Sequence, residues 1–180
     1  ANDEAIWRDG TLIARTGNAA PGLGGVTFSF VSSNLRLSDA GHVVFSATLA
    51  GSGVTATNDN SLWSNSRLVA REGNPATAAG AGVDFAGSFG SPVVNDLGEL
   101  AFTAFLTGTG VTSANDTSIW HDAALVAREG GAAPVAGGGV NFATLGAPVL
   151  NNAGQVAFFS ALTGAGVTAG NDAAIFRDGA

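Results

Sequence analysis

The sequence predicts an all-β fold, a β-propeller-like array with about four antiparallel strands in each repeat of 56–57 residues. Three observations lead to this prediction. One phrase recurs at a nearly fixed step, and each recurrence carries alternating apolar residues that are typical of strands. The 27 glycines against 5 prolines indicate many turns, while a hydrophobic content of 46% is too high for low-complexity disorder.

The recurring phrase organises the chain as a single repeat domain over residues 1–180. It reads NDEAIWRDGTLIARTG, then NDNSLWSNSRLVAREG, then NDTSIWHDAALVAREG, and NDAAIFRDGA begins it again. We place three units at 2–57, 58–114 and 115–170, and the start of a fourth at 171–180. Four sets of side chains keep this step and are predicted to hold structural positions of the repeat: Trp7, Trp63 and Trp120; Arg15, Arg71 and Arg128; Gly41, Gly98 and Gly154; Phe45, Phe102 and Phe158.

The segment 97–108 is the clearest strand of the middle unit. Its residues alternate between two faces, one with Leu100 and Phe102 and the other with Ala101 and Thr103. Both faces are small or apolar. Because a sheet with one face in water would carry charged side chains there, we expect this sheet to be covered on both sides.

Further strands surround this one in every unit. A hairpin is expected at 118–128, and the equivalent loop in the first unit, Asp9-Gly10, is typical of a type I′ turn. Another strand is expected at 91–94, and residues 83–85 either extend it or form a fifth strand. No stretch shows a helical period with caps.

Sheets that bury both faces are found where strands stack around an axis, as in the blades of a β-propeller. Each recurring phrase would then be the outer hairpin of one blade. A β-trefoil or another three-fold β fold is the alternative, since a trefoil also contains three four-stranded units.

Composition and charge exclude several classes of protein. The chain has no cysteine, so disulfides and thiolate metal sites are excluded. Its net charge of -7 repels a phosphate backbone, so we expect no nucleic-acid partner. No apolar run approaches the ~20 residues of a membrane-spanning helix, so we expect no membrane partner.

One motif carries a resemblance to a known family. The pattern NxxGxxAF occurs in full at 95–102 and 151–158, while Ser38 and Val44 interrupt it in the copy at 38–45. In this motif the chain resembles the tandem NxxGxxAF-repeat proteins of bacteria. The resemblance implies β-propeller-like repeats and a secreted or surface-anchored protein, and it supplies no catalytic residue.

The residue types used in catalysis are not arranged for it. His42 and His121 occupy places where the other units carry unrelated polar residues, so we expect both on the surface. No Ser, His and acid combination has the character of a catalytic triad. Carboxylates that could cleave a glycoside are explained better as turn residues. We therefore expect no catalytic residue and no enzyme.

A repeated aspartate in each unit is a weak candidate for calcium binding. It precedes the strand with the Trp or Phe and follows an asparagine, which could hold the loop by hydrogen bonds instead. Because each unit offers one such carboxylate, we expect no metal and no cofactor, with calcium as the alternative. The four residues are Asp3, Asp59, Asp116 and Asp172.

The repeated arginine ends a strand in every complete unit. We expect it to pair with the repeated aspartate or to bind loop carbonyls, with a ring of arginines around an anion as the alternative. The repeated tryptophans are expected in the core, although such rings also stack on sugars.

The sequence thus predicts a non-enzymatic structural or binding module of a secreted or surface bacterial protein. The alternatives are a carbohydrate-active or other hydrolytic propeller enzyme, and an excised or engineered repeat fragment. A glycan or a protein would be the ligand of a binding module. The hairpin at 5–16 can complete the strands at 148–162, so we expect self-association as a homodimeric six-bladed ring rather than a three-bladed monomer.

Overall fold

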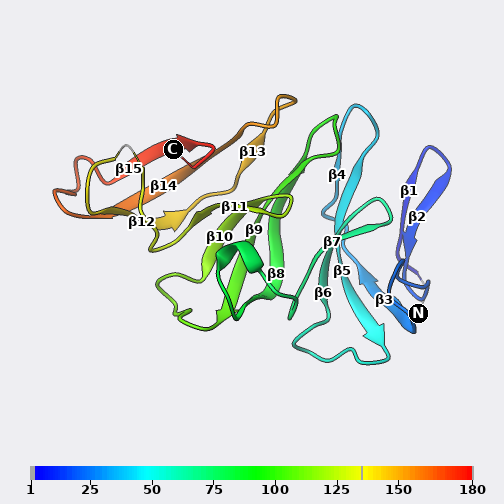
Figure 1. Ribbon diagram of the computed structural model, residues 1–180. Coiled ribbons are helices and arrows are strands. Elements are labelled where there is room, and N and C mark those ends of the chain that lie inside the picture. Colours follow the sequence, from blue (N-terminus) through cyan, green and yellow to red (C-terminus); the bar gives the residue numbers. More distant parts are fainter. Residues whose placement is uncertain (1–2, 135, 180) are drawn as a thin grey trace.

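The structure is a computed structural model that describes residues 3–134 and 136–179. Four antiparallel β-sheets follow one another along the chain (Figure 1). Apart from one 3-10 turn, η1 (Thr77–Ala79), the described residues form no helix. None of the described segments is therefore a helix long and apolar enough to cross a membrane. The predicted all-β, antiparallel fold is confirmed.

The sheets are numbered here in chain order. Sheet 1 is the hairpin β1–β2, and sheet 2 has the order β3-β5-β6-β7 with β4 also beside β5. Sheet 3 has the order β8-β9-β10-β11, and in sheet 4 the strand β14 has β12 and β13 on one side and β15 on the other. The strands are β1 (Ala5–Arg8), β2 (Thr11–Arg15), β3 (Val26–Val31), β4 (Arg36–Leu37), β5 (Val43–Gly51), β6 (Asn60–Ser64), β7 (Arg67–Arg71), β8 (Val83–Val94), β9 (Leu100–Gly108), β10 (Thr117–His121), β11 (Ala124–Arg128), β12 (Val140–Leu145), β13 (Val149–Leu150), β14 (Val156–Gly164) and β15 (Ala173–Arg177).

Sheets 2, 3 and 4 each combine strands from two successive units of the sequence. In sheet 3, β8 and β9 come from the unit at 58–114, and the hairpin β10–β11 comes from the unit at 115–170. The recurring phrase is therefore the outer hairpin of a sheet whose first strands precede it. The Asp9-Gly10 loop has positive φ at both residues, 47° and 78°, as a type I′ turn requires.

Three apolar cores separate the four sheets. Along β9, Leu100 and Phe102 lie in the core between sheets 2 and 3, whereas Ala101 lies in the core between sheets 3 and 4. The prediction that this strand buries both faces is confirmed at its start, whereas Phe105 on the second face is 50% exposed. Each core joins a leucine or isoleucine of the earlier sheet to an aromatic group of the later one, for example Leu62 to Trp120.

The tryptophans of the two middle hairpins belong to these cores. Trp63 and Trp120 are fully buried, and their indole N–H groups donate to Ser61 Oγ and Ser118 Oγ at 2.9 and 2.8 Å. Their rings also pack edge-on against phenylalanines. They are core residues, as predicted, but Trp7 is 61% exposed.

The NxxGxxAF turns stack on one another from sheet to sheet. The Oδ1 of Asn95 accepts from the backbone N–H of Leu97 and of Glu99, both at 3.0 Å, and so closes its own turn. Its Nδ2 donates to the carbonyl of Asn151 in the next turn at 3.0 Å. The asparagine thus shapes one turn and ties it to the next.

Two features require glycine at this position of the motif: its backbone conformation, and the close approach of a side chain from the preceding turn. Gly41, Gly98 and Gly154 have φ of 86°, 80° and 74°, in the left-handed region that favours glycine. A Cβ on Gly98 would lie 3.0 Å from the His42 ring, and one on Gly154 would lie 3.1 Å from the Glu99 carboxylate. The side chain after one motif glycine therefore covers the glycine of the next turn.

Two of the alternatives for the whole array do not agree with the structure. No sheet formed by the described residues closes into a barrel, which a β-trefoil would require. The N-terminal hairpin does not complete sheet 4 either, because β15 occupies the edge of β14 while β1–β2 forms a sheet of its own. The two ends of the chain lie at opposite ends of the row of sheets (Figure 1).

Candidate functional site

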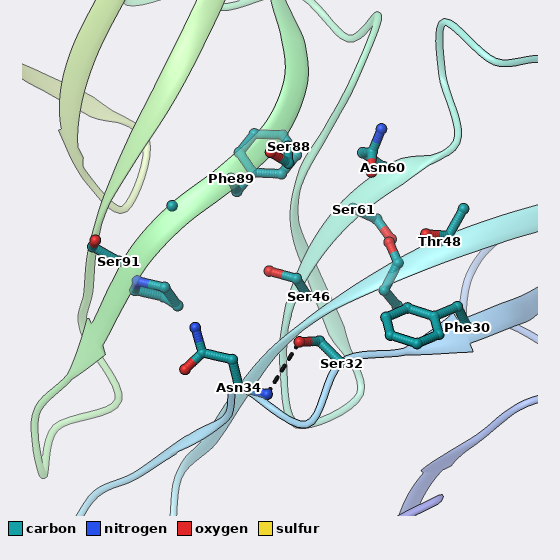
Figure 2. A pocket seen from close by; sticks show the side chains of 13 residues that line it. Phe30, Ser32, Asn34, Ser46, Thr48, Asn60, Ser61, Ser88, Phe89 and Ser91 are labelled. Carbon is teal, nitrogen blue, oxygen red and sulfur yellow. Dashed lines mark hydrogen bonds between the residues drawn. The ribbon is translucent and has the colours of Figure 1, made fainter. Parts of the chain in front are cut away.

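A pocket of about 270 Å³ lies between sheets 2 and 3 (Figure 2). Sheet 2 contributes β3 with the loop after it, β5 and the start of β6, and sheet 3 contributes residues 88–92 of β8. Its volume is slightly below the ~300 Å³ at which pockets for drug-sized ligands begin. The pocket is thus large enough for a small ligand.

Irregular backbone in β8 shapes the sheet 3 side of the pocket. The register of β8 on β9 shifts between Ala86 and Phe89 and again between Gly90 and Val93. Between these shifts Phe89 remains buried in the core. Ser91 has a φ of 46°, a conformation that non-glycine residues adopt rarely and that occurs often at functional sites.

The lining of the pocket is uncharged but rich in hydroxyl groups. Among the described residues, the hydroxyls of Ser46, Thr48, Ser88 and Ser91 have no hydrogen-bond partner. Figure 2 shows Ser46 pointing from β5 towards β8. Phe30 is 46% exposed and adds an aromatic surface to the lining. Such a site can bind a neutral polar ligand, but its lining has no side chain that exchanges protons near neutral pH.

The pocket was not predicted from the sequence. The expected strand at 91–94 is extended by residues 83–85, one of the two predicted alternatives, but the two irregularities of β8 were not predicted. A signal was present, because Gly90 and Pro92 inside a strand mark a bulge or an edge. The four free hydroxyls come from two strands that are distant in the sequence, β5 and β8, and form no motif.

The repeated aspartates do not converge. Asp59, Asp116 and Asp172 lie in equivalent loops of successive sheets, where their backbone carbonyls accept from leucine N–H groups at 2.7–2.8 Å. Asp3 lies in the first sheet's part of the array, where it lines a separate pocket together with Glu4 and Ala5. Within residues 3–134 and 136–179, no three His, Asp or Glu side chains are grouped to hold a metal ion.

The asparagines before Asp59, Asp116 and Asp172 hold their loops by hydrogen bonds. Asn58 Oδ1 accepts from the backbone N–H of Thr55 at 2.8 Å, and its Nδ2 donates to the carbonyl of Gly53 at 3.1 Å. Asn115 and Asn171 make the same pair of bonds in their own loops. The recurrence of Asn-Asp is therefore explained by loop structure.

Two of the repeated arginines, Arg71 and Arg128, bind carbonyls rather than carboxylates. Arg71 Nε donates to the carbonyl of Asn58 at 2.7 Å, and Arg128 Nε donates to that of Asn115 at 2.6 Å. The prediction of loop carbonyls is confirmed for these two, while no ion pair to the repeated aspartates forms among the described residues. Arg15, Arg71 and Arg128 are the last residues of the equivalent strands β2, β7 and β11, which belong to three successive sheets.

Neither histidine is a freely exposed surface residue. His42 is half-buried and its ring lies against Gly98 in the stacked turns. His121 is half-buried in β10, and its Nε2 is shielded from solvent without a hydrogen-bond partner among the described residues. The prediction of surface histidines was wrong because the stacked sheets cover the ends of the strands that carry them.

The fold and the site define an all-β repeat protein with stacked sheets and a neutral pocket. The chain belongs to a family of unknown function (DUF7453), whose model matches residues 2–179. A comparison with the curated proteins finds no match, and neither does a comparison with the solved structures.

Proposed function

We propose that the chain is a non-enzymatic structural and binding repeat module whose sheets form blades of a propeller-like array shared with a second copy of the chain. The observation that carries this proposal is a difference in burial between equivalent positions. Trp7 is 61% exposed, whereas its counterparts Trp63 and Trp120 are at most 1% exposed. Ile175 is 80% exposed, whereas Leu62 is fully buried.

The two exposed positions lie at opposite ends of the array and are complementary. Inside the chain, every core pairs an aliphatic face of one sheet with an aromatic face of the next. Trp7 belongs to the aromatic face of sheet 1, and Ile175 belongs to the aliphatic face of sheet 4. Apolar surface of this kind at both ends favours association with further surface of the same type.

An exchange of hairpins would bury Trp7 and would put Ile6 in the place of the exposed Ile175. In a second copy, β1 and β2 can take the edge of β14 that β15 occupies here, because Trp7 and Phe176 are equivalent in the repeat. The new sheet would have five strands, as sheet 2 has. Trp7 would lie beside Phe142 and Phe158, and Ile6 would remain packed against sheet 2 of its own chain. Two chains that exchange hairpins in this way form a homodimeric ring of six sheets.

The neutral pocket favours a binding role over an enzymatic one. Hydrolysis of a glycoside uses a pair of carboxylates, and the pocket lining contains no carboxylate and no histidine. The proposal of a secreted or surface-anchored bacterial protein rests on the resemblance of the motif at 95–102 and 151–158.

Light scattering tests the proposed assembly. We expect a mass of twice 17.6 kDa at micromolar concentration, and a mass of 17.6 kDa would contradict the dimer. Trp7→Ser should shift the protein to monomer with little loss of monomer stability, because Trp7 is largely exposed in a single chain. Leu97→Ser is the matched control, since Leu97 is also exposed but lies in a stacked turn outside the proposed joint.

A further inference from the structure

We propose that the pocket between sheets 2 and 3 binds one unit of a neutral saccharide. This inference goes beyond the structural role, because none of the residues that line the pocket belongs to β1 or β15. The site is complete within one chain. Binding there and self-association can therefore be tested separately.

The absence of charge in the lining determines the charge of the ligand. A charged group that enters such a pocket would lose its hydration without gaining a partner of opposite charge. The net charge of -7 on the chain further disfavours acidic saccharides. A neutral ligand has neither cost.

The free hydroxyls determine the polarity of the ligand. Ser46 and Thr48 line the pocket from β5, and Ser88 and Ser91 line it from β8, so that unpaired hydroxyls lie on both sides of the pocket. Each hydroxyl can donate one hydrogen bond and accept others. A saccharide offers the same pattern on its own hydroxyls, whereas an apolar ligand would leave these groups without partners.

The exposed ring of Phe30 supplies the remaining element of sugar recognition. In Figure 2 this ring lies on the sheet 2 side of the pocket, beside Thr48. Aromatic side chains provide flat apolar surface at low conformational cost, and the C–H face of a sugar ring packs on such a surface. Together with a volume of about 270 Å³, this arrangement fits one sugar ring.

The repeat itself contains a natural control for this site. The equivalent residues of sheet 3 line a pocket of only about 80 Å³, in which Thr103, Phe105 and Thr117 lie with Ser88 and Gly90. Phe105 occupies the position of Thr48, so a phenyl ring lines the smaller pocket where a threonine lines the larger one. The fold accepts a phenylalanine there, and Thr48→Phe should therefore close the larger pocket without unfolding the chain.

Amide NMR with four neutral sugars tests the proposal. The probes are methyl α-glucoside, methyl α-mannoside, methyl β-galactoside and N-acetylglucosamine at about 10 mM, which detects a Kd in the millimolar range. We expect at least one sugar to shift the amide signals of residues 46–48 and 88–91. Thr48→Phe should weaken that binding at least tenfold, and Ser46→Ala should weaken it about threefold to tenfold, as the loss of one hydrogen bond implies.

The controls separate the pocket from general surface effects. Thr107→Phe adds the same ring to an exposed position of β9 outside the pocket and should leave the affinity unchanged. The proposal is overturned if none of the four sugars binds, or if Thr48→Phe binds as tightly as the parent chain. Equal binding of glucuronate would also overturn it, because the proposed ligand is neutral.

Discussion

Replacement of Asn95 by alanine should remove a connection between two units of the repeat. The Asn95 side chain is almost fully buried and makes four hydrogen bonds. Three lie within its own turn, including one to Glu99 Oε2, and the fourth reaches the Asn151 carbonyl of the next turn. A hydrogen bond contributes about 0.5–1.5 kcal/mol net, and part of the exposed turn can bind water instead. We therefore expect Asn95→Ala to lower the free energy of unfolding by about 2–4 kcal/mol.

Asn151 provides the matched comparison. Its Oδ1 accepts from the backbone N–H of Ala153 and of Gln155 at 3.0 and 2.9 Å, as Asn95 does in the preceding turn. However, Asn151 is exposed, and its Nδ2 donates to Gln155 of its own turn rather than to another turn. Asn151→Ala should therefore cost only about 1–2 kcal/mol.

Urea unfolding followed by tryptophan fluorescence measures both losses. The slope of the free energy against urea should stay constant, so that the change in midpoint reports stability alone. For a chain of 180 residues, Asn95→Ala should lower Tm by roughly 4–16 °C. If Asn151→Ala lowers the free energy of unfolding as much as Asn95→Ala does, the hydrogen bond from Asn95 to the next turn adds nothing to stability, and the reasoning is refuted.

Three further predictions follow from individual contacts. Arg71→Ala should cost about 1–2 kcal/mol in urea unfolding, because it removes a charged donor from the half-buried Asn58 carbonyl, and an unchanged midpoint would show that this bond contributes nothing. The pKa of Asp96 is lowered from its ordinary value of 3.8, first by the backbone N–H of Ala40 and then by the Asn152 amide. Because the folded pKa is the lower one, this contribution to stability is present above pH ~4 and is lost as pH falls below it, so Asp96→Asn should flatten the stability profile only in that acidic range. Addition of EDTA should leave Tm unchanged, and a clear fall would show that the repeated aspartates hold a metal ion.

Local patterns in the sequence were sufficient to predict the strands and their faces. The alternation of Leu100, Ala101 and Phe102 gives the two buried faces of β9, because side chains of a strand point alternately to opposite sides. The Asp9-Gly10 turn is equally local, since only residues that accept positive φ fit it. These features depend on a few neighbouring residues and do not require knowledge of the tertiary structure.

The site and the contacts between units could not be predicted in the same way. The pocket depends on two shifts of register in β8, and a one-residue shift changes which side chains face the neighbouring sheet. The repeat indicated that Arg71 has a recurring partner, but Asp59 and the carbonyl of Asn58 recur at the same step. Only the geometry of the loop distinguishes them.

A disulfide between two chains tests the proposed exchange of hairpins most directly. Ala157 on β14 pairs with Arg177 here, and Arg8 is the residue of β1 equivalent to Arg177. Cross-strand neighbours are close enough for a disulfide, and the chain has no cysteine of its own. The double variant Arg8→Cys with Ala157→Cys should therefore oxidise to a covalent dimer of twice 17.6 kDa, while each single variant shows no such dimer. Free thiols on a monomer, or a disulfide closed within one chain, would contradict the shared six-sheet ring.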